Sequence, residues 1–304
     1  MRVATIDIGT NSVLLLVAER AGGALHAVTE RATITRLGEG VDRTKQLSAA
    51  AIARTCACID DYAKIIRDER VERIAVVGTS AMRDAGGGEE VRRHVQQALG
   101  IEARVLSGAD EARLTFRGAL SGMELNGERD LAVFDIGGGS TEVVIGRPDA
   151  APAFAESFDV GSVRLTERLV RHAPLLPEER AAITRTARDV FSNVPPLPNS
   201  QPPVGIAGTM TTLAAVSLAL VPYDGARVHG HVMTRDELAS VVDRLASLDV
   251  TARREVAGME PKRADVIVAG GLVAVALLDH WKATAARVSD RGVRWGVAEE
   301  LAGD

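Results

Sequence analysis

The chain has 304 residues, a net charge of −5, and 46% hydrophobic and 25% charged residues, which is typical of a globular protein. This length suits two domains of ordinary size. The negative balance supplies no global field that would attract a nucleic acid or an anionic membrane, so we expect neither as a partner. No apolar run is long enough to cross a bilayer, and Asp7 interrupts any apolar stretch at the start, so we expect a cytoplasmic protein.

Short apolar strands alternate with helical stretches in the first part of the chain, which indicates an α/β fold. Ser48 is a plausible cap for one helix, and Ser107 with Asp110 forms an approximate capping box for another. The glycines at 86–88 are predicted to form a loop. The predicted elements are strands at 2–8, 13–18, 24–35, 74–77 and up to 105–106, and helices at 47–68, after residue 80 and at 107–120.

A polar stretch at 121–130 separates this part from a second part with a similar beginning. We therefore predict two domains, 1–122 and 123–304, with the final helix at 294–304 as a candidate to pack on the first. A proline-rich stretch at 194–203 is predicted to be a linker or an extended loop. The other predicted elements are strands at 131–136, 143–145 and 204–207, a Gly-Thr turn at 208–209, and helices at 211–220, 235–248 and 264–280.

The two parts begin with matching segments. Asp7-Ile8-Gly9-Thr10-Asn11-Ser12 precedes one apolar run, and Asp135-Ile136-Gly137-Gly138-Gly139-Ser140-Thr141-Glu142 precedes another. Each segment reads as a strand, an aspartate, a glycine turn with hydroxyl groups, and a second strand. This internal repeat predicts two similar lobes that each start with a hairpin.

Glycine turns of this kind suit phosphate binding. Their backbone N–H groups can approach an anion closely and form a nest for it, and the hydroxyls of Thr10, Ser12, Ser140 and Thr141 add donors. The carboxylates of Asp7, Asp135 and Glu142 would repel phosphate directly but can hold Mg²⁺, which bridges to phosphate oxygens. A single such turn is more often an ordinary hairpin, but two copies at the ends of buried strands favour the phosphate-binding interpretation.

Three further segments are less specific by themselves. Gly205-Ile206-Ala207-Gly208-Thr209 leads into a helix whose N-terminus can bind an anion. Arg83 follows a strand and opens a helix, so its spacing fits a phosphate site and a surface position equally. Asp110 and Glu111 lie in a first helical turn, where simple pairing with the helix dipole explains them as well as chemistry does. The chain has neither a Walker lysine motif nor a dinucleotide-binding glycine motif.

These segments together resemble the exopolyphosphatase and guanosine pentaphosphate phosphatase (Ppx/GppA) family. The resemblance follows the order of the family's motifs over essentially the whole chain, in its short two-domain form. The matching segments are DIGTNS at 7–12, RLGEG at 36–40, GTSAMRDA at 78–85, LSGADEARLTFRGA at 106–119, DIGGGSTE at 135–142, GIAGTMTTLAA at 205–215, PKRADVIVAGG at 261–271 and VSDRGVRWG at 288–296.

The resemblance implies two RNase H-like domains of the actin, Hsp70 and sugar-kinase type, with an active site in an interdomain cleft. It implies release of a terminal orthophosphate with Mg²⁺ or another divalent cation such as Mn²⁺. Glu111 would be the general base, with a pKa raised by its surroundings, and Asp7, Asp135 and Glu142 would position metal or water. The implied phosphate-binding residues are Thr10, Asn11, Ser12, Arg83, Gly137, Gly138, Gly139, Ser140, Thr141, Gly208 and Thr209.

Several alternatives stay open at this point. Inorganic polyphosphate and guanosine pentaphosphate would use the same machinery, and a small-molecule kinase or a non-catalytic nucleotide sensor can have the same fold. Arg36 and Arg263 would meet a nucleotide or distal phosphates, or else form surface salt bridges. His229 and His231 are too few to define a metal site, so a structural role or a position at the rim of the site is favoured. Members of the family are often dimers, which leaves a homodimer open.

Overall fold

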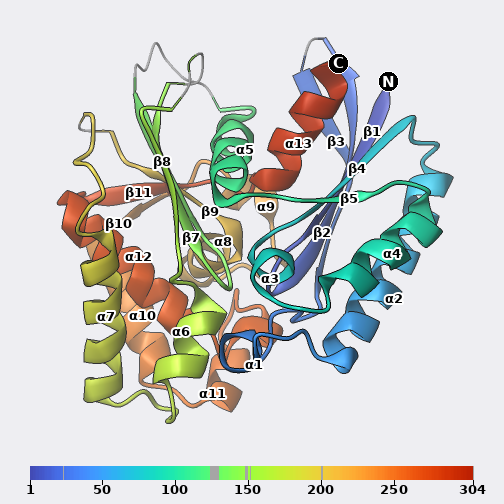
Figure 1. Cartoon of the computed structure of the whole chain (residues 1–304). Helices are drawn as coiled ribbons and strands as arrows, with labels where there is room; N and C mark the ends of the chain where they lie inside the picture. The colour runs from blue at the N-terminus through green and yellow to red at the C-terminus, as the bar shows by residue number, and fades with distance from the viewer. Residues whose placement is uncertain (23, 124–129, 148–149, 151, 200, 304) are drawn as a thin grey trace. The chain divides into compact units, whose positions relative to one another are not determined.

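The computed structural model describes the whole chain except residues 23, 124–129, 148–149, 151, 200 and 304. The chain divides into two compact units (Figure 1). Unit 1 contains Met1–Gly122 together with Gly292–Asp304, and unit 2 contains Met123–Arg291. Within the described part, no helix is long and apolar enough to span a membrane.

Unit 1 is built on one five-stranded sheet. Its strands are β1 (Arg2–Ile8), β2 (Ser12–Ala21), β3 (Ala24–Ile34), β4 (Arg73–Gly78) and β5 (Ala103–Val105). Its helices are α1 (Val41–Thr44), α2 (Ala49–Asp68), α3 (Ser80–Asp84), α4 (Gly88–Leu99), α5 (Gly108–Leu120) and α13 (Val293–Gly303).

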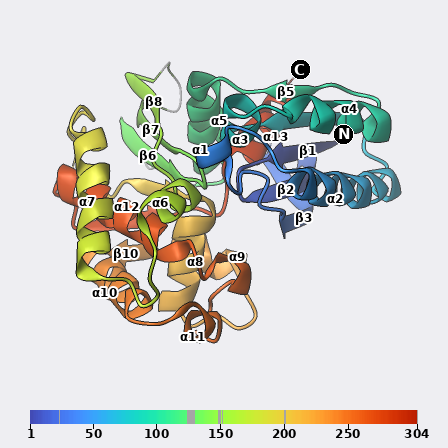
Figure 2. The same ribbon diagram turned by 60° about the horizontal axis from the view of Figure 1, so that its bottom comes forward.

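Helices cover both faces of the first sheet, because its central strands bury side chains on both sides. Ala4, Ile6 and Ile8 of β1 pack in a core with α2 and α4, which lie together in Figure 2. Val3 packs in a separate cluster with Trp295 of α13. Successive side chains of β1 therefore face opposite sides of the sheet. Helix α13 contacts both α5 and the sheet.

The strand order of unit 1 is β3-β2-β1-β4-β5, in which β1, β4 and β5 are parallel. Ile8 pairs with Gly78, and Gly78 pairs with Val105, so these three strands end at the same edge of the sheet. In open α/β sheets, ligands bind outside the carboxyl ends of the strands. Five of the predicted site residues follow these three strand ends: Thr10, Asn11, Ser12, Arg83 and Glu111.

Unit 2 repeats this plan with one additional strand. Its strands are β6 (Leu131–Ile136), β7 (Thr141–Gly146), β8 (Phe154–Phe158), β9 (Val204–Ile206), β10 (Val232–Thr234) and β11 (Ala285–Val288). Its helices are α6 (Ser162–Leu169), α7 (Pro177–Phe191), α8 (Ala207–Ser217), α9 (Gly225–Val228), α10 (Arg235–Ala246), α11 (Val250–Arg254), the 3-10 helix η1 (Pro261–Arg263) and α12 (Ile267–Trp281).

The strand order of unit 2 is β8-β7-β6-β9-β11-β10. Numbered within each unit, the first sheet has the order 3-2-1-4-5 and the second the order 3-2-1-4-6-5, so both share 3-2-1-4, with the second strand antiparallel to the first, as in RNase H-like domains. Helix α12 lies at the centre of the helical layer and contacts α6, α7, α8 and α10. Twelve of its fifteen residues are buried, which is why its sequence is apolar on all sides.

Most of the predicted elements are present, and two glycine segments differ from the prediction. Gly208 and Thr209 do not form a turn, because α8 begins at Ala207 directly after β9. Gly88 is already helical, and Gly87, with φ of 95°, makes the left-handed turn before α4. The sequence alone did not predict the strands β8, β10 and β11, nor the helices α1, α6, α7, α9, α11 and η1. The predicted boundary at 121–130 lies largely outside the described residues.

Candidate functional site

The residues predicted to form a site fall into two groups, one in each unit. In unit 1 the first loop, Gly9–Ser12, joins β1 to β2 and is closed by a hydrogen bond from Gly9 N to Ser12 O at 2.9 Å. The segment after β3 holds this loop from outside. Gly38 N donates to Thr10 O at 2.8 Å, and the N–H groups of Thr35 and Arg36 both donate to Asn11 O at 3.1 and 2.9 Å.

These contacts use the carbonyl groups of the first loop and leave its donors available. Among the described residues, the backbone N–H groups of Thr10 and Asn11 donate no hydrogen bond. The side chain of Asn11 is only 6% exposed, yet neither its nitrogen nor its oxygen has a partner in the described part of the chain. A buried amide without partners is costly and is expected where a ligand supplies them.

Other predicted residues surround the same loop. Asp7 is buried at the end of β1, and Ser12 is buried at the start of β2. The hydroxyl of Thr10 lies 2.7 Å from that of Ser80, which starts α3 after β4. Arg36 has φ of 52°, a strained conformation for a residue with a side chain, and its backbone N–H is bound to the loop.

Arg83 and Glu111 form an ion pair in unit 1. Nη1 of Arg83 lies 2.7 Å from Oε2 of Glu111 and donates to Leu106 O at 3.1 Å. Glu111 is buried in the first turn of α5, where Ser107 caps the helix by accepting a hydrogen bond from Asp110 N. Arg83 therefore does not lie free on the surface, and Glu111 does more than pair with the helix dipole. The ion pair therefore holds the Glu111 carboxylate in a fixed orientation.

The second loop, Gly137–Ser140, has the same internal hydrogen bond, from Gly137 N to Ser140 O at 3.0 Å. Here the N-terminus of α6 binds the carbonyl groups. Ser162 N donates to Gly137 O at 2.9 Å, and the N–H groups of Val163 and Arg164 donate to Gly138 O at 2.9 and 3.0 Å. Nε of Arg164 donates to Gly139 O. The N–H groups of Gly138 and Gly139 donate no hydrogen bond within the described residues.

The remaining predicted phosphate-binding residues of unit 2 lie around this second loop. Ser140 and Thr141 are buried, and the Thr141 hydroxyl donates to Val160 O. The hydroxyl of Thr209 donates to Ile136 O at 2.8 Å, which ties the start of α8 to the end of β6. A Thr209 hydroxyl used in this way is a support for the loop, so its predicted contact with phosphate stays a prediction.

Arg263 crosses directly over Gly208. A Cβ atom at Gly208 would lie 2.1 Å from Cζ of Arg263, so a larger residue there would displace the guanidinium. Burial lowers the pKa of Arg263, while the Glu260 and Tyr223 side chains act in the opposite direction. Arg263 thus lies beside the N-terminus of α8 and is not simply a surface arginine.

Asp135 and Glu142 are directly paired residues of the antiparallel strands β6 and β7, so their side chains lie on the same face of the sheet. Glu142 is 1% exposed, and the Ser157 hydroxyl donates to it at 2.5 Å. Like charges directly opposite each other destabilise a sheet, so this pair suits a divalent cation that offsets both charges. Mg²⁺ is commonly held by one or two carboxylates together with substrate phosphates. The described residues of the chain contain no cluster of three or more His, Cys, Asp or Glu side chains that could hold a metal ion.

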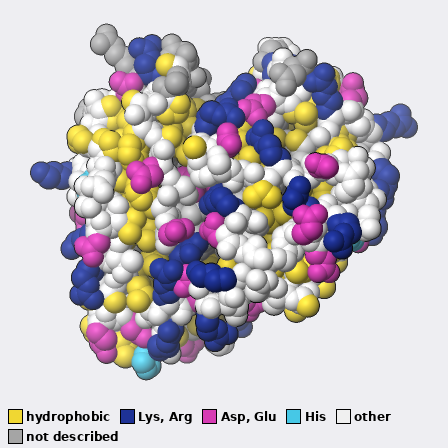
Figure 3. Space-filling model, in the orientation of Figure 1, with side chains coloured by type: hydrophobic (Ala, Val, Ile, Leu, Met, Phe, Trp, Pro, Cys, Tyr) yellow, Lys and Arg dark blue, Asp and Glu magenta, His cyan; other side chains and the backbone are white. Residues whose placement is uncertain are grey.

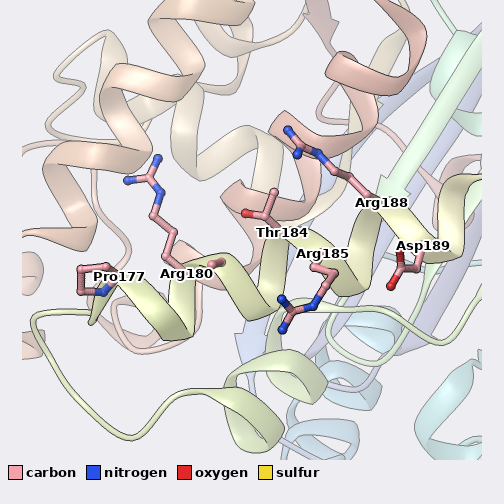
Figure 4. A pocket seen from close by; sticks show the side chains of 7 residues that line it. Pro177, Arg180, Thr184, Arg185, Arg188 and Asp189 are labelled. Atoms are coloured by element: carbon pink, nitrogen blue, oxygen red, sulfur yellow. The ribbon is translucent and has the colours of Figure 1, made fainter.

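A hollow in unit 2 outside the two loops also carries arginines. Basic and acidic side chains are interspersed on the face drawn in Figure 3. A shallow hollow of about 500 Å³ lies along α7 and is lined by Arg180, Arg185 and Arg188 among others. Arg180 and Arg188 extend to one side of the helix and Arg185 to the other (Figure 4). Arg180 is paired with Asp243 and Arg188 with Asp279, so this hollow is not a concentrated basic patch.

The structure also contains contacts that the sequence alone did not indicate. Ser80 and the N-terminus of α6 both touch a predicted loop, but neither belongs to a glycine motif. Nδ1 of His229 lies 3.0 Å from the Asp290 carboxylate, which follows β11 at the edge where β9 and β11 end in register. The structural role favoured for His229 thus has a definite partner, the aspartate of the SDRG segment.

Comparison with known proteins is consistent with this geometry. The model of the Ppx/GppA phosphatase family matches residues 16–303. Exopolyphosphatase 2 of Mycobacterium tuberculosis is 37% identical, and the alignment covers 99% of each chain. The guanosine-5'-triphosphate,3'-diphosphate pyrophosphatase of Vibrio atlanticus is 28% identical over 98% of this chain but only 59% of that protein. The crystal structure of an Aquifex aeolicus Ppx/GppA family member is 34% identical, with a TM-score of 0.84 over 100% of this chain and 99% of that one.

Proposed function

The chain belongs to the Ppx/GppA phosphatase family, and we propose that it is an exopolyphosphatase that releases the terminal orthophosphate of inorganic polyphosphate. The observation that carries this proposal is the shared geometry of the two loops. In each loop the following segment of the chain binds the carbonyl groups, and two consecutive N–H groups have no partner among the described residues. Such N–H groups form a nest for anions, and two nests suit a substrate that is a chain of phosphates.

Each predicted phosphate ligand has a distinct part in this proposal. In the first loop, the N–H groups of Thr10 and Asn11 and the Asn11 amide would bind phosphate oxygens. In the second, the N–H groups of Gly138 and Gly139 would do so, and Gly137 and Ser140 would keep the loop closed. Ser12, Thr141 and Gly208 would line the loops. Arg36, Arg83 and Arg263 would add positive charge, because a guanidinium group can bind phosphate through two N–H groups at once.

We propose that Glu111 accepts a proton from the attacking water. The water oxygen forms a bond to the terminal phosphorus, the bond from that phosphorus to the bridging oxygen breaks, and the shortened polyphosphate leaves with the electron pair. Arg83 fixes the orientation of the Glu111 carboxylate through its contact at 2.7 Å. A positioned general base contributes a factor of roughly 10² to 10⁴ to a hydrolytic rate.

Asp7, Asp135 and Glu142 are the proposed residues for a divalent cation, Mg²⁺ or Mn²⁺. The cation would offset phosphate charge and make the terminal phosphorus easier to attack. The opposed carboxylates of Asp135 and Glu142 support this assignment because they concentrate negative charge at one point of the sheet. Asp7 is buried at the equivalent strand end of unit 1.

Polyphosphate is favoured over guanosine pentaphosphate as the substrate because the relative that matches this chain over 99% of both lengths is an exopolyphosphatase. The decisive experiment incubates the purified protein with polyphosphate or guanosine pentaphosphate, with Mg²⁺ or with a chelator, and measures orthophosphate. We expect release from polyphosphate that requires the cation. Release from guanosine pentaphosphate alone would establish the alternative, and ADP formed from ATP only in the presence of a sugar or an acid would establish a kinase. Location in the cytoplasm and a homodimer stay predictions.

A further inference from the structure

Arg253 is an arginine buried in unit 2, at some distance along the chain from every motif described above. It lies on α11 and is 2% exposed. Its Nε donates to Leu245 O at 2.6 Å, and its Nη1 donates to Ala264 O at 3.2 Å. Burial lowers the pKa of Arg253, and the Asp249 and Asp265 carboxylates oppose this effect. A buried guanidinium bound mainly through backbone carbonyls is a costly way to fill space, since an apolar side chain would avoid the desolvation penalty.

The two carbonyl groups that Arg253 binds belong to separate parts of the chain. Leu245 lies in the last turn of α10, and its carbonyl group also accepts a hydrogen bond from Leu248 N at 3.3 Å. Ala264 follows η1 and is fully buried. The chain between Arg253 and Ala264 is also pressed against α8, because a Cβ atom at Gly258 would lie 2.1 Å from Ala215 O. Arg253 therefore fastens the end of this segment to the helical layer.

Arg263 immediately precedes the carbonyl group that Arg253 holds. Two consecutive carbonyl groups of the backbone are held here. Val266 N donates to Arg263 O at 3.0 Å, and Arg253 donates to Ala264 O. From this backbone the Arg263 side chain reaches over Gly208 at the N-terminus of α8. A small rotation of the peptide would displace the guanidinium at the far end of a long side chain.

We propose that Arg253 is a positioning residue that sets where Arg263 lies over the N-terminus of α8, and thereby sets the affinity of this part of unit 2 for polyphosphate. The inference rests on the proposed role of Arg263 as a phosphate ligand. Arg253 itself touches neither loop. Its planar fork can serve two carbonyl groups at fixed positions, which the single ammonium group of a lysine cannot do equally well.

The alternative is that Arg253 only stabilises the fold, and a double-mutant cycle separates the two. The variants are Arg253→Met, which keeps an unbranched apolar stem, Arg253→Lys, Arg263→Gln, and the double variant that combines Arg253→Met with Arg263→Gln. Trp281→Phe is the matched control, because Trp281 Nε1 donates to Pro195 O and likewise fastens a loop of unit 2 to its helical layer. The dissociation constant for polyphosphate is measured by calorimetry without turnover, and Tm is measured for each variant.

We expect Arg253→Met and Arg263→Gln each to weaken polyphosphate binding by about tenfold, with the double variant no weaker than Arg263→Gln alone. Arg253→Lys should give an intermediate loss, and it keeps the test possible if Arg253→Met fails to fold. Trp281→Phe should lower Tm and leave the dissociation constant unchanged.

Three results would overturn the inference in different ways. Arg253 variants with lowered Tm and unchanged affinity would assign Arg253 to stability alone. Losses that add in the double variant would show that Arg253 acts independently of Arg263. An Arg263→Gln variant with unchanged affinity would remove Arg263 from the phosphate site, and the Arg253 inference with it. Wild-type protein that binds polyphosphate but does not hydrolyse it would contradict the proposed function while leaving this cycle measurable.

Discussion

The two loops of this protein share one pattern of backbone hydrogen bonds and differ in the chemical groups that they carry. Gly9 and Gly137 each donate to a serine carbonyl three residues later, at 2.9 and 3.0 Å. In both units the segment after the third strand binds the carbonyl groups of the loop. A glycine makes that approach possible in each case, since Cβ atoms at Gly38 and Gly161 would lie 2.3 and 2.4 Å from Thr10 and Gly138.

The difference lies in the chemistry that each loop presents. The first loop carries side chains, and the ion pair of Arg83 with Glu111 lies in the same unit. The second loop carries glycines, held by the first turn of a helix, and two opposed carboxylates lie just before and after it. In the proposed function the duplicated loop pattern thus divides its tasks: proton transfer is assigned to unit 1, the paired carboxylates belong to unit 2, and both loops offer backbone amides.

The largest expected effect comes from removing the proposed general base, which lies in unit 1. Glu111→Gln keeps the shape of the side chain but cannot accept a proton, so polyphosphate hydrolysis should fall at least about a hundredfold. Orthophosphate release measures this, and Tm shows whether the fold is kept. Asp110→Asn is the matched control, because it makes the same change at an exposed neighbour in the same helical turn and should leave the rate within about twofold. Full activity of a folded Glu111→Gln variant would reject the assignment.

The next effect tests how each loop is held. Gly161→Ala would bring Cβ to 2.4 Å from Gly138 O and 2.7 Å from Gly139 C, so the backbone of the second loop has to move. Gly38→Ala meets the Thr10 methyl group instead, which is part of a side chain. Overpacking costs about 1–3 kcal/mol, and we expect Gly161→Ala to lie at the upper end and to lose more activity.

Gly303→Ala is the control for this pair, since nothing lies within 4 Å of its Cβ position. Thermal unfolding and orthophosphate release are compared for the three alanine variants. If Gly38→Ala lost more activity than Gly161→Ala, the amide groups of the second loop would not be the more sensitive part of the site.

Substitution of Asn11 is expected to have a smaller effect, and the direction of its change in Tm is informative. Asn11→Leu keeps most of the volume and removes a buried amide that has no partner among the described residues, a group whose burial costs about 1–3 kcal/mol. We expect Tm to stay equal or rise while the affinity for polyphosphate falls. Thr55→Val is the control, because the fully buried Thr55 hydroxyl in α2 also lacks a partner there and should give a similar Tm change with unchanged affinity. A lower Tm with unchanged affinity for Asn11→Leu would assign Asn11 to the fold.

Much of the structure of the two loops could be predicted from the sequence because it depends on local sequence patterns. The repeated Asp-Ile-Gly segments predicted both loops and the strands beside them. Ser48 and Ser107 cap their helices as expected, since each side chain accepts a backbone N–H three residues later. The structure also brings Arg83 and Glu111 together, although spacing alone left both residues open to simpler roles.

The missed features depend on contacts between distant parts of the chain. The N-terminus of α6 has Gly161 as its N-cap and no capping side chain, so no local signal marked the helix that holds the second loop. The predicted turn at Gly208 is wrong, and the left-handed residue is Ala207, with φ of 63°. Gly208 instead leaves room for the guanidinium of Arg263, a residue far along the chain that the sequence pattern could not place beside it.

The smallest expected effect concerns pH and should appear in unit 2. Glu179 fastens the chain between α6 and α7, because its carboxylate accepts hydrogen bonds from Arg171 N, Leu176 N and His172 Nδ1 at 2.7–3.0 Å. Burial alone would raise the pKa of Glu179, but these hydrogen bonds outweigh burial and the pKa lies below its usual value.

A lowered pKa adds stability at pH values above the pKa of the unfolded state, about 4.3, and that stability is lost as the pH falls through the pKa of the folded state. Glu179→Gln should therefore have a lower Tm than wild type at pH 7, and the difference should shrink as the pH falls below about 4.3 and through the lowered folded pKa. Thermal unfolding between pH 7 and pH 3 measures this, with Glu178→Gln, its exposed neighbour, as the control. Since α6 is the helix that holds the second loop, parallel curves for wild type and Glu179→Gln would show that its attachment to α7 does not depend on this carboxylate.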